Sequence, residues 1–342
     1  MKHFVLPTRC GPLARGLAVL MMGLLLATPY AHAQQRNPLQ KIGHTVLDEP
    51  AASYRFETFV VDSPDQQRRW RVNLAIPAKA GKTPAPVLYA LDGNAVAMVL
   101  DQPLLAELAA RKVPPVLVLI GYDNDLRIDS KARTRDYTAW IDRADDESGA
   151  TQAAGGGAAA FLDVIERRIK PEVERRARID TQQQALWGHS LGGLFVLSTL
   201  YTRPAAFQSY LAASPSLWWS QGAALGDPEL QFVQNVHGQP AKLWLMLGGA
   251  ERVGDRGKRD MSNPRVVAHL RRIGAATPDA AMQLSERLRK VPGLSVQYRE
   301  FPGLGHGPML PASFHAALHE LYNVADRSAG DGVSTGGDNT AD

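Results

Sequence analysis

One stretch of this sequence, residues 184–201, constrains the fold more than any other. It reads QALWGHSLGGLFVLSTLY, in which an apolar run leads to a serine flanked by glycines and a second apolar run follows. The G-x-S-x-G spacing of Gly188, Ser190 and Gly192 is typical of a sharp turn from a strand into a helix, because neighbours without bulk let the two segments pass closely. The sequence therefore predicts a β-α unit with an exposed serine hydroxyl at its turn.

Short apolar segments alternate with helical ones along most of the chain. The predicted strands cover 54–61, 68–77, 85–93, 113–122, 184–188, 209–213, 242–248 and 294–301, and the predicted helices cover 95–112, 158–176, 191–201, 262–273, 279–290 and 312–325. The first two strands flank the turn sequence DSPDQ and are expected to form a hairpin, whereas continuous apolar runs are typical of parallel strands covered on both faces. The predicted fold class is α/β, with a mostly parallel twisted sheet, an N-terminal antiparallel hairpin and helices on both faces.

Two segments interrupt this alternation. The polar stretch from Asp123 to Gly157 has the composition of a long loop, and loops of that length in compact domains are usually functional or mobile. Pro171 falls inside the helix predicted over 158–176 and is expected to bend or end it, because proline lacks the backbone N–H of the helical hydrogen bond.

The first 33 residues have the composition of a cleaved export signal. A basic start precedes an apolar run over 17–27, and Ala31-His32-Ala33 has the small-x-small pattern of a cleavage site. The run is shorter than the roughly 20 residues that span a bilayer, so a cleaved signal is favoured over an uncleaved anchor. We predict a signal peptide over 1–33, one α/β domain over 34–327 and a disordered tail over 328–342, where Gly, Ser, Thr and Asp dominate.

Removal of this signal would change both the cysteine content and the charge of the chain. Cys10 is the only cysteine, so the mature protein would hold no thiol and no disulfide. Three of the basic residues would leave with the signal, which lowers the formal net charge from +4 to +1. A nearly neutral chain of this kind does not have the electrostatic footprint of a nucleic-acid-binding protein.

A serine on a strand-to-helix turn is a candidate nucleophile. The turn exposes the Ser190 hydroxyl at a helix N-terminus, where the backbone N–H of Leu191 and the helix dipole favour a developing negative charge. A second backbone donor is expected in the loop after the third predicted strand, at Asn94. Asp92 in that loop is expected to cap the turn, and His189 is expected to pack rather than to take part in the chemistry.

The serine also needs a base and an orienting acid. His306 lies in REFPGLGHGPM, after the last predicted strand and between two glycines, and the chain order of serine before histidine agrees with α/β-hydrolases. The segment KLWLMLGGAERVGD offers Glu251 and Asp255 as the acid. Glu251 is favoured because it follows the strand end most closely, although a surface role for it and a Ser-His dyad stay open.

Four ordered motifs together resemble one family. IGYDNDLRIDSKARTRDYT, GHSLGGLFVL, AASPSLWW and FPGLGHGPMLPASFHAAL resemble the esterase-D/enterochelin-esterase group of α/β-hydrolases, and within it the periplasmic trilactone esterases that hydrolyse catecholate siderophores. The resemblance runs from about residue 40 to 325. It implies an α/β-hydrolase fold with Ser190 as nucleophile, His306 as base, and the amides of Asn94 and Leu191 as the oxyanion hole.

The resemblance also implies how a substrate is held. Arg133, with Arg135 adjacent, matches an arginine expected to meet the anionic, iron-loaded catecholate ligand, and a guanidinium fork suits bidentate contacts with oxygen. Tyr137 in the same segment and Trp218 after SPS are also expected to contact the substrate, with core packing as the alternative for Trp218. The long acidic continuation DYTAWIDRADDESGA departs from the family pattern, which leaves the siderophore open.

The sequence therefore predicts an exported, periplasmic serine esterase that cleaves the ester bonds of a catecholate siderophore such as ferric enterobactin. No metal or cofactor is expected, because iron would arrive on the substrate; His315 and His319 form an i, i+4 pair without an evident third ligand and are expected on a solvated helix face. No nucleic-acid partner and no stable membrane span are expected. Two alternatives stay open: a general carboxylesterase or acyltransferase, and a non-catalytic siderophore-binding protein of this fold.

Overall fold

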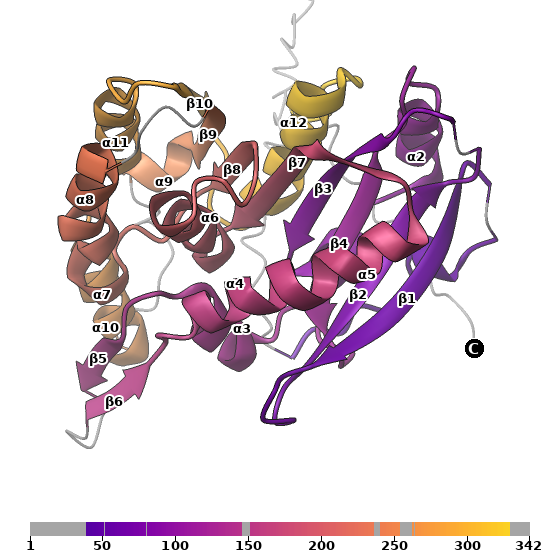
Figure 1. The fold of residues 1–342 in the computed structure, drawn as a ribbon. Coiled ribbons are helices and arrows are strands. Elements are labelled where there is room, and N and C mark those ends of the chain that lie inside the picture. The colour runs from indigo at the N-terminus through magenta and orange to yellow at the C-terminus, as the bar shows by residue number, and fades with distance from the viewer. Residues whose placement is uncertain are drawn as a thin grey trace, which may run out of the picture. The chain divides into compact units, whose positions relative to one another are not determined.

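A mixed sheet of eight strands runs through the computed structural model in the order β1-β2-β4-β3-β7-β8-β9-β10 (Figure 1). The structure describes residues 39–50, 52–79, 81–145, 151–235, 240–253, 262 and 264–328. The strands are β1 (Tyr54–Asp62), β2 (Arg69–Pro77), β3 (Ala85–Leu91), β4 (Val116–Tyr122), β7 (Ile179–His189), β8 (Ser209–Ala213), β9 (Ala241–Gly248) and β10 (Leu294–Phe301). β1, β2 and β4 pair antiparallel, and all neighbours from β4 to β10 pair parallel. This confirms the predicted mostly parallel sheet with an N-terminal hairpin.

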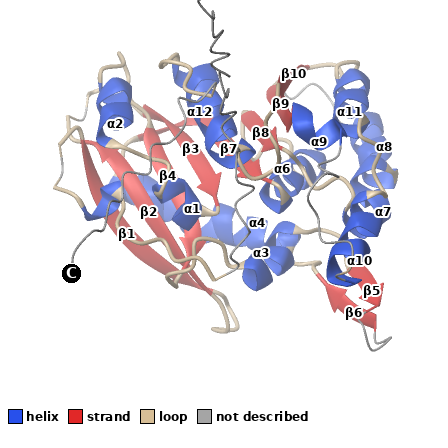
Figure 2. Cartoon of the chain, turned by 180° about the vertical axis from the view of Figure 1, so that it is seen from behind, coloured by secondary structure: helices blue, strands red, loops and turns tan. Residues whose placement is uncertain are grey.

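Helices cover both faces of the sheet, as predicted. They are α1 (Gly93–Ala97), α2 (Gln102–Ala109), α3 (Ser130–Tyr137), α4 (Ala158–Val164), α5 (Lys170–Arg176), α6 (Leu191–Thr202), α7 (Trp219–Gly222), α8 (Asp227–Asn235), α9 (Gly249–Val253), α10 (Pro264–Ile273), α11 (Ala280–Leu288) and α12 (Met309–Tyr322). Figure 1 shows α4 and α5 crossing one face, and Figure 2 shows α2 and α12 on the other. Successive strand side chains point to opposite faces, so Leu186 packs in one hydrophobic core and Trp187 in the other.

The segment predicted as one helix over 95–112 is two helices. The Asp101 side chain accepts a hydrogen bond from the backbone N–H of Leu104 at 2.7 Å and caps the start of α2. Pro103 lies in the first turn of α2, where its missing N–H costs nothing. The prediction of one continuous helix was wrong. Apolar residues recur at helical spacing on both sides of Asp101, so the periodicity does not show the break between the two helices.

Pro171 does not end its helix. The helical path continues from α4 through a π-helical turn, Ile165–Ile169, into α5, which begins one residue before the proline. A π-turn pairs residues five apart instead of four, and such turns occur as single insertions in α-helices. In this turn the backbone N–H of Lys170 donates to the carbonyl of Ile165. The first turn of α5 therefore accepts Pro171 without a break.

The polar stretch 123–157 is not only a loop. It contains α3 and a small two-stranded ribbon, β5 (Asp142–Asp145) with β6 (Thr151–Ala154). The Asp129 carboxylate caps α3 by accepting from the backbone N–H of Ala132 at 2.9 Å. Hydrophobic periodicity does not reveal α3, because two of its three buried side chains, Arg133, Asp136 and Tyr137, are charged.

Buried hydrogen bonds fix α3 against the sheet. The carboxylate of Asp136, fully buried, accepts from Trp70 Nε1 at 2.9 Å, from Arg68 Nη1 at 2.8 Å and from the Tyr122 hydroxyl at 3.2 Å. Burial raises the pKa of Asp136 above its ordinary value, although these three donors oppose the shift. Because buried polar groups are costly unless paired, this cluster holds α3 in one orientation over β2 and β4.

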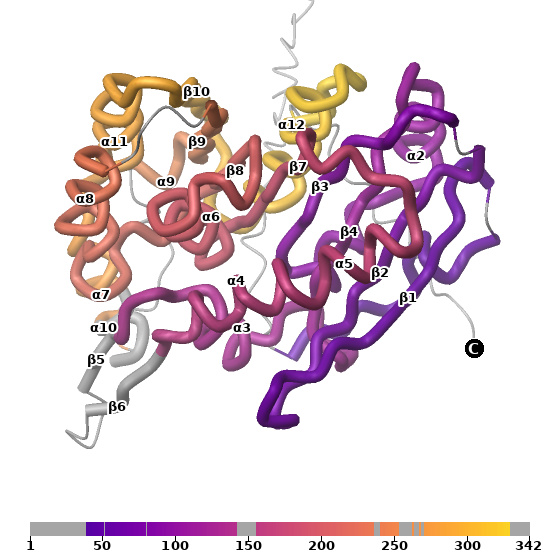
Figure 3. The backbone as a smooth tube through the Cα atoms, in the orientation of Figure 1, coloured from indigo at the N-terminus to yellow at the C-terminus, as the bar shows by residue number. Residues whose placement is uncertain are grey.

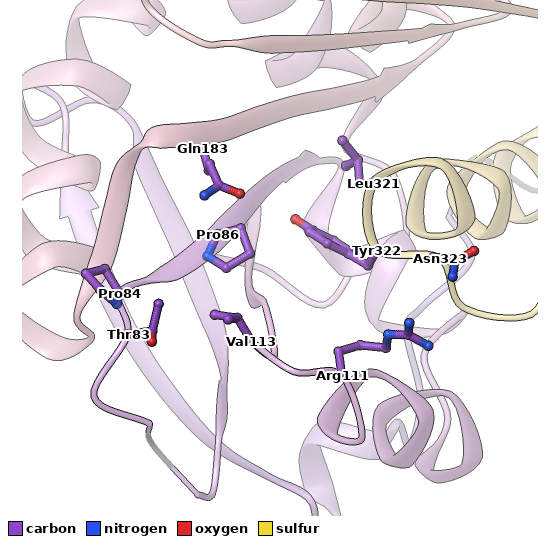
Figure 4. Close-up of a pocket in the computed structure, with 9 residues that line it drawn as sticks. All are labelled: Thr83, Pro84, Pro86, Arg111, Val113, Gln183, Leu321, Tyr322 and Asn323. Carbon is purple, nitrogen blue, oxygen red and sulfur yellow. The ribbon is translucent and has the colours of Figure 1, made fainter.

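The candidate site lies at the carboxyl ends of the parallel strands, where β7 turns into α6 (Figure 3). A pocket of about 300 Å³ lies elsewhere, near the amino end of β3 and the end of α12 (Figure 4). Thr83, Pro84 and Pro86 line it together with Tyr322 and Asn323. The pocket is thus set apart from the serine turn, since the two ends of a parallel strand lie at opposite edges of the sheet.

Both predicted terminal segments lie largely outside the described residues. None of the predicted signal peptide, 1–33, is described, and of the predicted tail only Ser328 is. Its hydroxyl accepts from Arg299 and donates to Asp326. Among the helices that the structure describes, none is both long and apolar enough to cross a membrane.

Candidate active site

The serine turn depends on backbone geometry that only small neighbours permit. Ser190 has φ 63° and ψ −118°, a backbone conformation that residues other than glycine rarely adopt and that is typical of a strained functional turn. A Cβ added to Gly188 would lie 2.4 Å from the carbonyl oxygen of Gly192. The turn therefore requires glycine at position 188 and presents the Ser190 hydroxyl at the start of α6.

Replacing Gly188 with alanine is expected to lower the stability by about 1–3 kcal/mol, the usual cost of overpacking, and to reduce activity, because the backbone on both sides of Ser190 must shift. Thermal unfolding and ester turnover measure the two effects. Gly81→Ala is the control, since the one atom of the described residues near a Cβ at Gly81 is Thr83 N, at 3.9 Å. Equal melting temperatures of the two variants would contradict the requirement for glycine.

Three side chains from distant parts of the chain meet at this turn. The Nε2 atom of His306 lies 2.9 Å from Ser190 Oγ, and its Nδ1 atom lies 2.6 Å from Glu251 Oε2. Ser190 is the N-cap of α6, Glu251 lies in α9 directly after β9, and His306 lies in the loop between β10 and α12. The structure thus brings together the three residues predicted as nucleophile, base and acid, while the alternative acid, Asp255, lies outside the described residues.

Glu251 is held as an ionised carboxylate. Its Oε1 atom accepts from Ser214 Oγ at 2.6 Å and from the backbone N–H of Gly248 at 3.0 Å, which leaves Oε2 for His306. Burial alone would raise the pKa of Glu251, but the hydrogen bond and charge of His306, with the bonds from Ser214 and Gly248, hold it below its ordinary 4.5. A fixed carboxylate of this kind sets the tautomer and the orientation of an imidazole.

Replacing Glu251 with glutamine is expected to lower kcat by about 10³- to 10⁴-fold with little change in shape, because an amide cannot stabilise the imidazolium. Steady-state kinetics with a small chromogenic ester measure this effect. The control is Glu172→Gln, which alters an exposed ion pair on α5. A Glu251→Gln variant with wild-type kcat would leave Ser190 and His306 as a dyad.

The same variant is expected to change the pH dependence of stability. Because the pKa of Glu251 is lowered on folding, its ionised form stabilises the protein above pH 4.5, and this contribution is lost as the pH falls below that value. Glutamine cannot ionise. The difference in melting temperature between wild type and variant should therefore shrink as the pH falls below 4.5.

The predicted oxyanion donors lie in segments that are firmly held. Asn94 lies in the first turn of α1, and its side-chain Nδ2 donates to the carbonyls of Tyr122, Asn124 and Leu126 at 3.3, 3.2 and 2.9 Å. Leu191 is the first residue of α6, where backbone N–H groups have no partner within the helix. Both amides thus belong to helix starts, which favour negative charge.

The prediction that Asp92 caps its turn was wrong. Its side chain makes no capping bond; instead it accepts from Arg133 Nε at 2.9 Å and from Arg133 Nη2 at 2.8 Å. Arg133 Nη2 also donates to the carbonyl of His189 at 3.1 Å. The side chain of Asp92 is only 3% exposed and that of Arg133 only 10%. Burial alone would lower the pKa of Arg133, but the charge and hydrogen bonds of Asp92 raise it above the usual value.

This ion pair changes the expectation for Arg133. Its guanidinium does not reach outward as an open fork, because two of its three nitrogens bond within the protein. Among the described residues Nη1 has no hydrogen-bond partner, and it is not a fully buried atom. A substrate oxygen can therefore meet Arg133 only at this remaining edge, next to the turn that carries Ser190.

Arg135 and Tyr137, both predicted to contact the substrate, lie on different faces of α3. Tyr137 follows Arg133 by one helical turn and is 1% exposed; its hydroxyl accepts from the backbone N–H of Asp92 at 3.0 Å. Arg135 lies on the other face of α3 and is exposed, and its charge contributes to lowering the pKa of Asp65. Tyr137 is therefore too buried to contact a substrate, whereas Arg135 is exposed on the face of α3 opposite to Arg133.

Trp218 lies beside the serine turn and is half-buried. Ser216, two residues earlier, is buried and places its hydroxyl 3.3 Å from Ser190 Oγ. The Trp218 ring lies 5.9 Å from that of Trp219, and the guanidinium of Arg272 lies 5.3 Å from it. Trp219 is the core residue of the pair, so the partly exposed ring of Trp218 is the one that can meet a ligand.

Sequence reasoning missed two serines that complete this site. The SPS motif places Ser214 on Glu251 and Ser216 on Ser190, and both side chains are 2% exposed. The sequence feature that could have revealed them is a pair of serines directly after the apolar strand 209–213. Since the carboxyl ends of neighbouring parallel strands meet at one edge of the sheet, such a pair after β8 is a candidate for the site formed after β7 and β9.

His315 and His319 are not on a solvated face. Both are half-buried, and His319 Nδ1 donates to the carbonyl of Val324 at 2.6 Å. Burial lowers the pKa of His315 below its ordinary value. Across the ranges that the structure describes, no three His, Cys, Asp or Glu side chains gather in a group that could hold a metal ion.

Comparison with known proteins identifies the family. The sequence model described as "Putative esterase" matches residues 63–277, which include the serine turn and Glu251. The chain belongs to this esterase family. Together with the names of the relatives below, this establishes an enzyme that hydrolyses ester bonds.

The esterase has similar relatives over most of its length. It is 34% identical to the apo-salmochelin esterase of Escherichia coli O6:H1 (strain CFT073), over 85% of this chain and 86% of that protein. It is 32% identical to the ferri-bacillibactin esterase BesA of Bacillus subtilis (strain 168), over 77% and 88%. The solved "Enterobactin and Salmochelin Hydrolase IroE" is 33% identical and superposes with a TM-score of 0.60, over 81% of this chain and 98% of that one.

Proposed function

We propose that this esterase hydrolyses the ester bonds of a siderophore, and that its substrate is a catecholate trilactone such as enterobactin, free or iron-loaded. Relatives with more than 30% identity over most of both chains are named as siderophore esterases, which supports the substrate class. The observation that carries the chemistry is the contact of Ser190, His306 and Glu251.

The proposed reaction is acyl transfer to water in two steps. Ser190 Oγ attacks the ester carbonyl as His306 Nε2 takes its proton, and Glu251 stabilises the imidazolium that forms. The tetrahedral intermediate collapses when His306 returns the proton to the leaving alkoxide, which leaves the acyl group on Ser190. Water, activated by the same imidazole, then releases the acid and restores the serine.

Charge on the carbonyl oxygen is stabilised by groups that are already oriented. In this proposal the N–H groups of Asn94 and Leu191 donate to the oxyanion, and the remaining edge of Arg133 adds positive charge beside it. Each such donor typically contributes about 10²- to 10³-fold to the rate. The half-exposed ring of Trp218 offers an apolar surface to an aromatic acyl group.

We also propose that the enzyme is exported and acts in the periplasm. The support is the composition of residues 1–33, with a basic start, an apolar run and the Ala31-His32-Ala33 pattern. Determination of the N-terminus of the protein recovered from a periplasmic extract tests this, and the expected first residue is Gln34. A mature protein that keeps residues 1–33 would refute cleavage.

Product analysis tests the substrate. The purified protein is incubated with enterobactin, free and iron-loaded, and the products are followed by mass spectrometry; the expected series is the linear trimer, then shorter fragments, with none formed by Ser190→Ala. An equal kcat/KM for a small chromogenic ester would favour a general carboxylesterase. Binding of the ferric siderophore by Ser190→Ala, without product from the wild type, would favour the non-catalytic alternative.

A further inference from the structure

The loop that carries His306 is rich in glycine, and one of its side chains, the partly buried Leu304, packs against the core. It reads PGLGHGP over residues 302–308, between β10 and α12. A Cβ added to Gly303, Gly305 or Gly307 would meet no atom of the described residues within 4 Å, so these residues leave space beside the backbone on both sides of His306. Glycine-rich backbone has more conformations to lose than other backbone, so contacts beyond the bond from His306 to Glu251 help to hold this histidine in place.

His189 supplies one such contact, to the backbone of His306. Its Nε2 atom lies 2.9 Å from the carbonyl oxygen of His306, and the two imidazole rings lie 4.7 Å apart between centroids at 41°. A carbonyl can only accept, so Nε2 of His189 carries the proton and donates it. This nitrogen is therefore committed to the backbone and is not a second base for Ser190.

His189 is itself well fixed. It is the last residue of β7, is 6% exposed and directly precedes Ser190. Its carbonyl accepts from Arg133 Nη2 at 3.1 Å, and Arg133 is paired with Asp92. One residue thus touches the loop of the base through its ring and the Asp92–Arg133 pair through its backbone, and it is covalently joined to the nucleophile.

We propose that His189 is a positioning residue for His306. Its N–H and its ring hold the backbone and the imidazole of His306 so that Nε2 stays within hydrogen-bond reach of Ser190 Oγ while the proton moves. This inference rests on the proposed serine esterase mechanism. A misplacement of about 1 Å in a reacting pair can cost about 10²-fold in rate, so a hydrogen bond to the backbone of the base has a large effect on turnover.

Three variants separate this role from simple packing. His189→Leu keeps an apolar side chain of similar size without the donor, His189→Ala removes both, and His189→Gln keeps an N–H at a similar reach. The first two are expected to lower kcat for a small chromogenic ester by about 10²-fold with KM unchanged. His189→Gln is expected to stay within about 10-fold of the wild type. His319→Leu is the matched control, because it removes another histidine-to-carbonyl bond, on α12.

A second measurement does not depend on substrate binding. The rate of covalent labelling by a fluorophosphonate reports the alignment of Ser190 with His306, and it should fall in His189→Leu in parallel with kcat. Proton NMR of the hydrogen bond between His306 and Glu251 should show a shifted or broadened signal in that variant and not in His319→Leu. Melting temperatures establish that each variant is folded.

The outcomes are distinguishable. If His189→Leu is folded and is labelled as fast as the wild type, or if His189→Gln loses as much kcat as His189→Leu, the positioning role is refuted while the esterase mechanism stands. If the wild-type protein is neither labelled nor active on any ester, the proposed mechanism itself fails. Parallel loss of kcat and labelling in His189→Leu, with recovery in His189→Gln, supports the inference.

Discussion

Replacing Ser190 with alanine is expected to abolish turnover, with a fall in kcat of about 10⁴- to 10⁶-fold and a melting temperature close to that of the wild type. Without the hydroxyl no acyl-enzyme forms, and the remaining oxyanion donors act only on direct attack by water. The measurement is ester hydrolysis at high enzyme concentration, with mass spectrometry of the intact protein to detect the acyl adduct on the wild type.

The matching experiment removes the base as well. His306→Ala is expected to cost as much as Ser190→Ala, and the double variant to cost no more than either, because residues that act as a unit are not additive. Additive losses in the double variant would contradict a shared proton transfer between the two side chains, which lie 2.9 Å apart.

Replacing Asp92 with alanine is expected to lower the free energy of unfolding by about 3–5 kcal/mol, the usual cost of leaving a buried charge without its partner. The charge left behind is that of Arg133, whose side chain is only 10% exposed. Urea or thermal unfolding measures the loss. Activity should fall too, because Asp92 directly precedes the helix that holds Asn94 and lies 3.7 Å from the position of a Cβ on Gly192.

Two controls test whether the loss in Asp92→Ala comes from the buried charge. Asp62→Ala breaks an exposed ion pair with Arg69 and is expected to cost less than about 1 kcal/mol. The double variant Asp92→Asn/Arg133→Met removes both charges and should recover much of the stability, because no charge is then left buried without its partner. Equal losses in Asp92→Ala and Asp62→Ala would contradict the buried pair as a structural element.

Local pattern was enough to predict the frame of the site. All eight strands of the main sheet, the serine turn and the position of His306 after the last strand followed from runs of apolar residues and from glycine spacing. Each of these features is encoded within about 20 residues, where periodicity and turn chemistry act directly. The family resemblance added the class of reaction, which family membership and the names of similar proteins support.

Polar contacts between distant residues could not be predicted in this way. α3 escaped detection because its buried face holds Arg133 and Asp136, and their partners are far away in the sequence. The pairing of Arg133 with Asp92 commits two of its three guanidinium nitrogens within the protein and leaves one edge for a substrate. Tyr137, expected at the substrate, is buried for the same reason, since it shares a helical face with Arg133.

The sequence by itself determined the order of elements and the serine on the turn from β7 into α6, because short-range sterics and apolar patterning act between neighbours in the chain. Only the tertiary structure decided which carboxylate faces His306, which arginine nitrogen remains accessible and that His189 meets the loop of the base. These contacts join residues that meet only where the carboxyl ends of the parallel strands converge, and each depends on ångström-scale distances that no local pattern records.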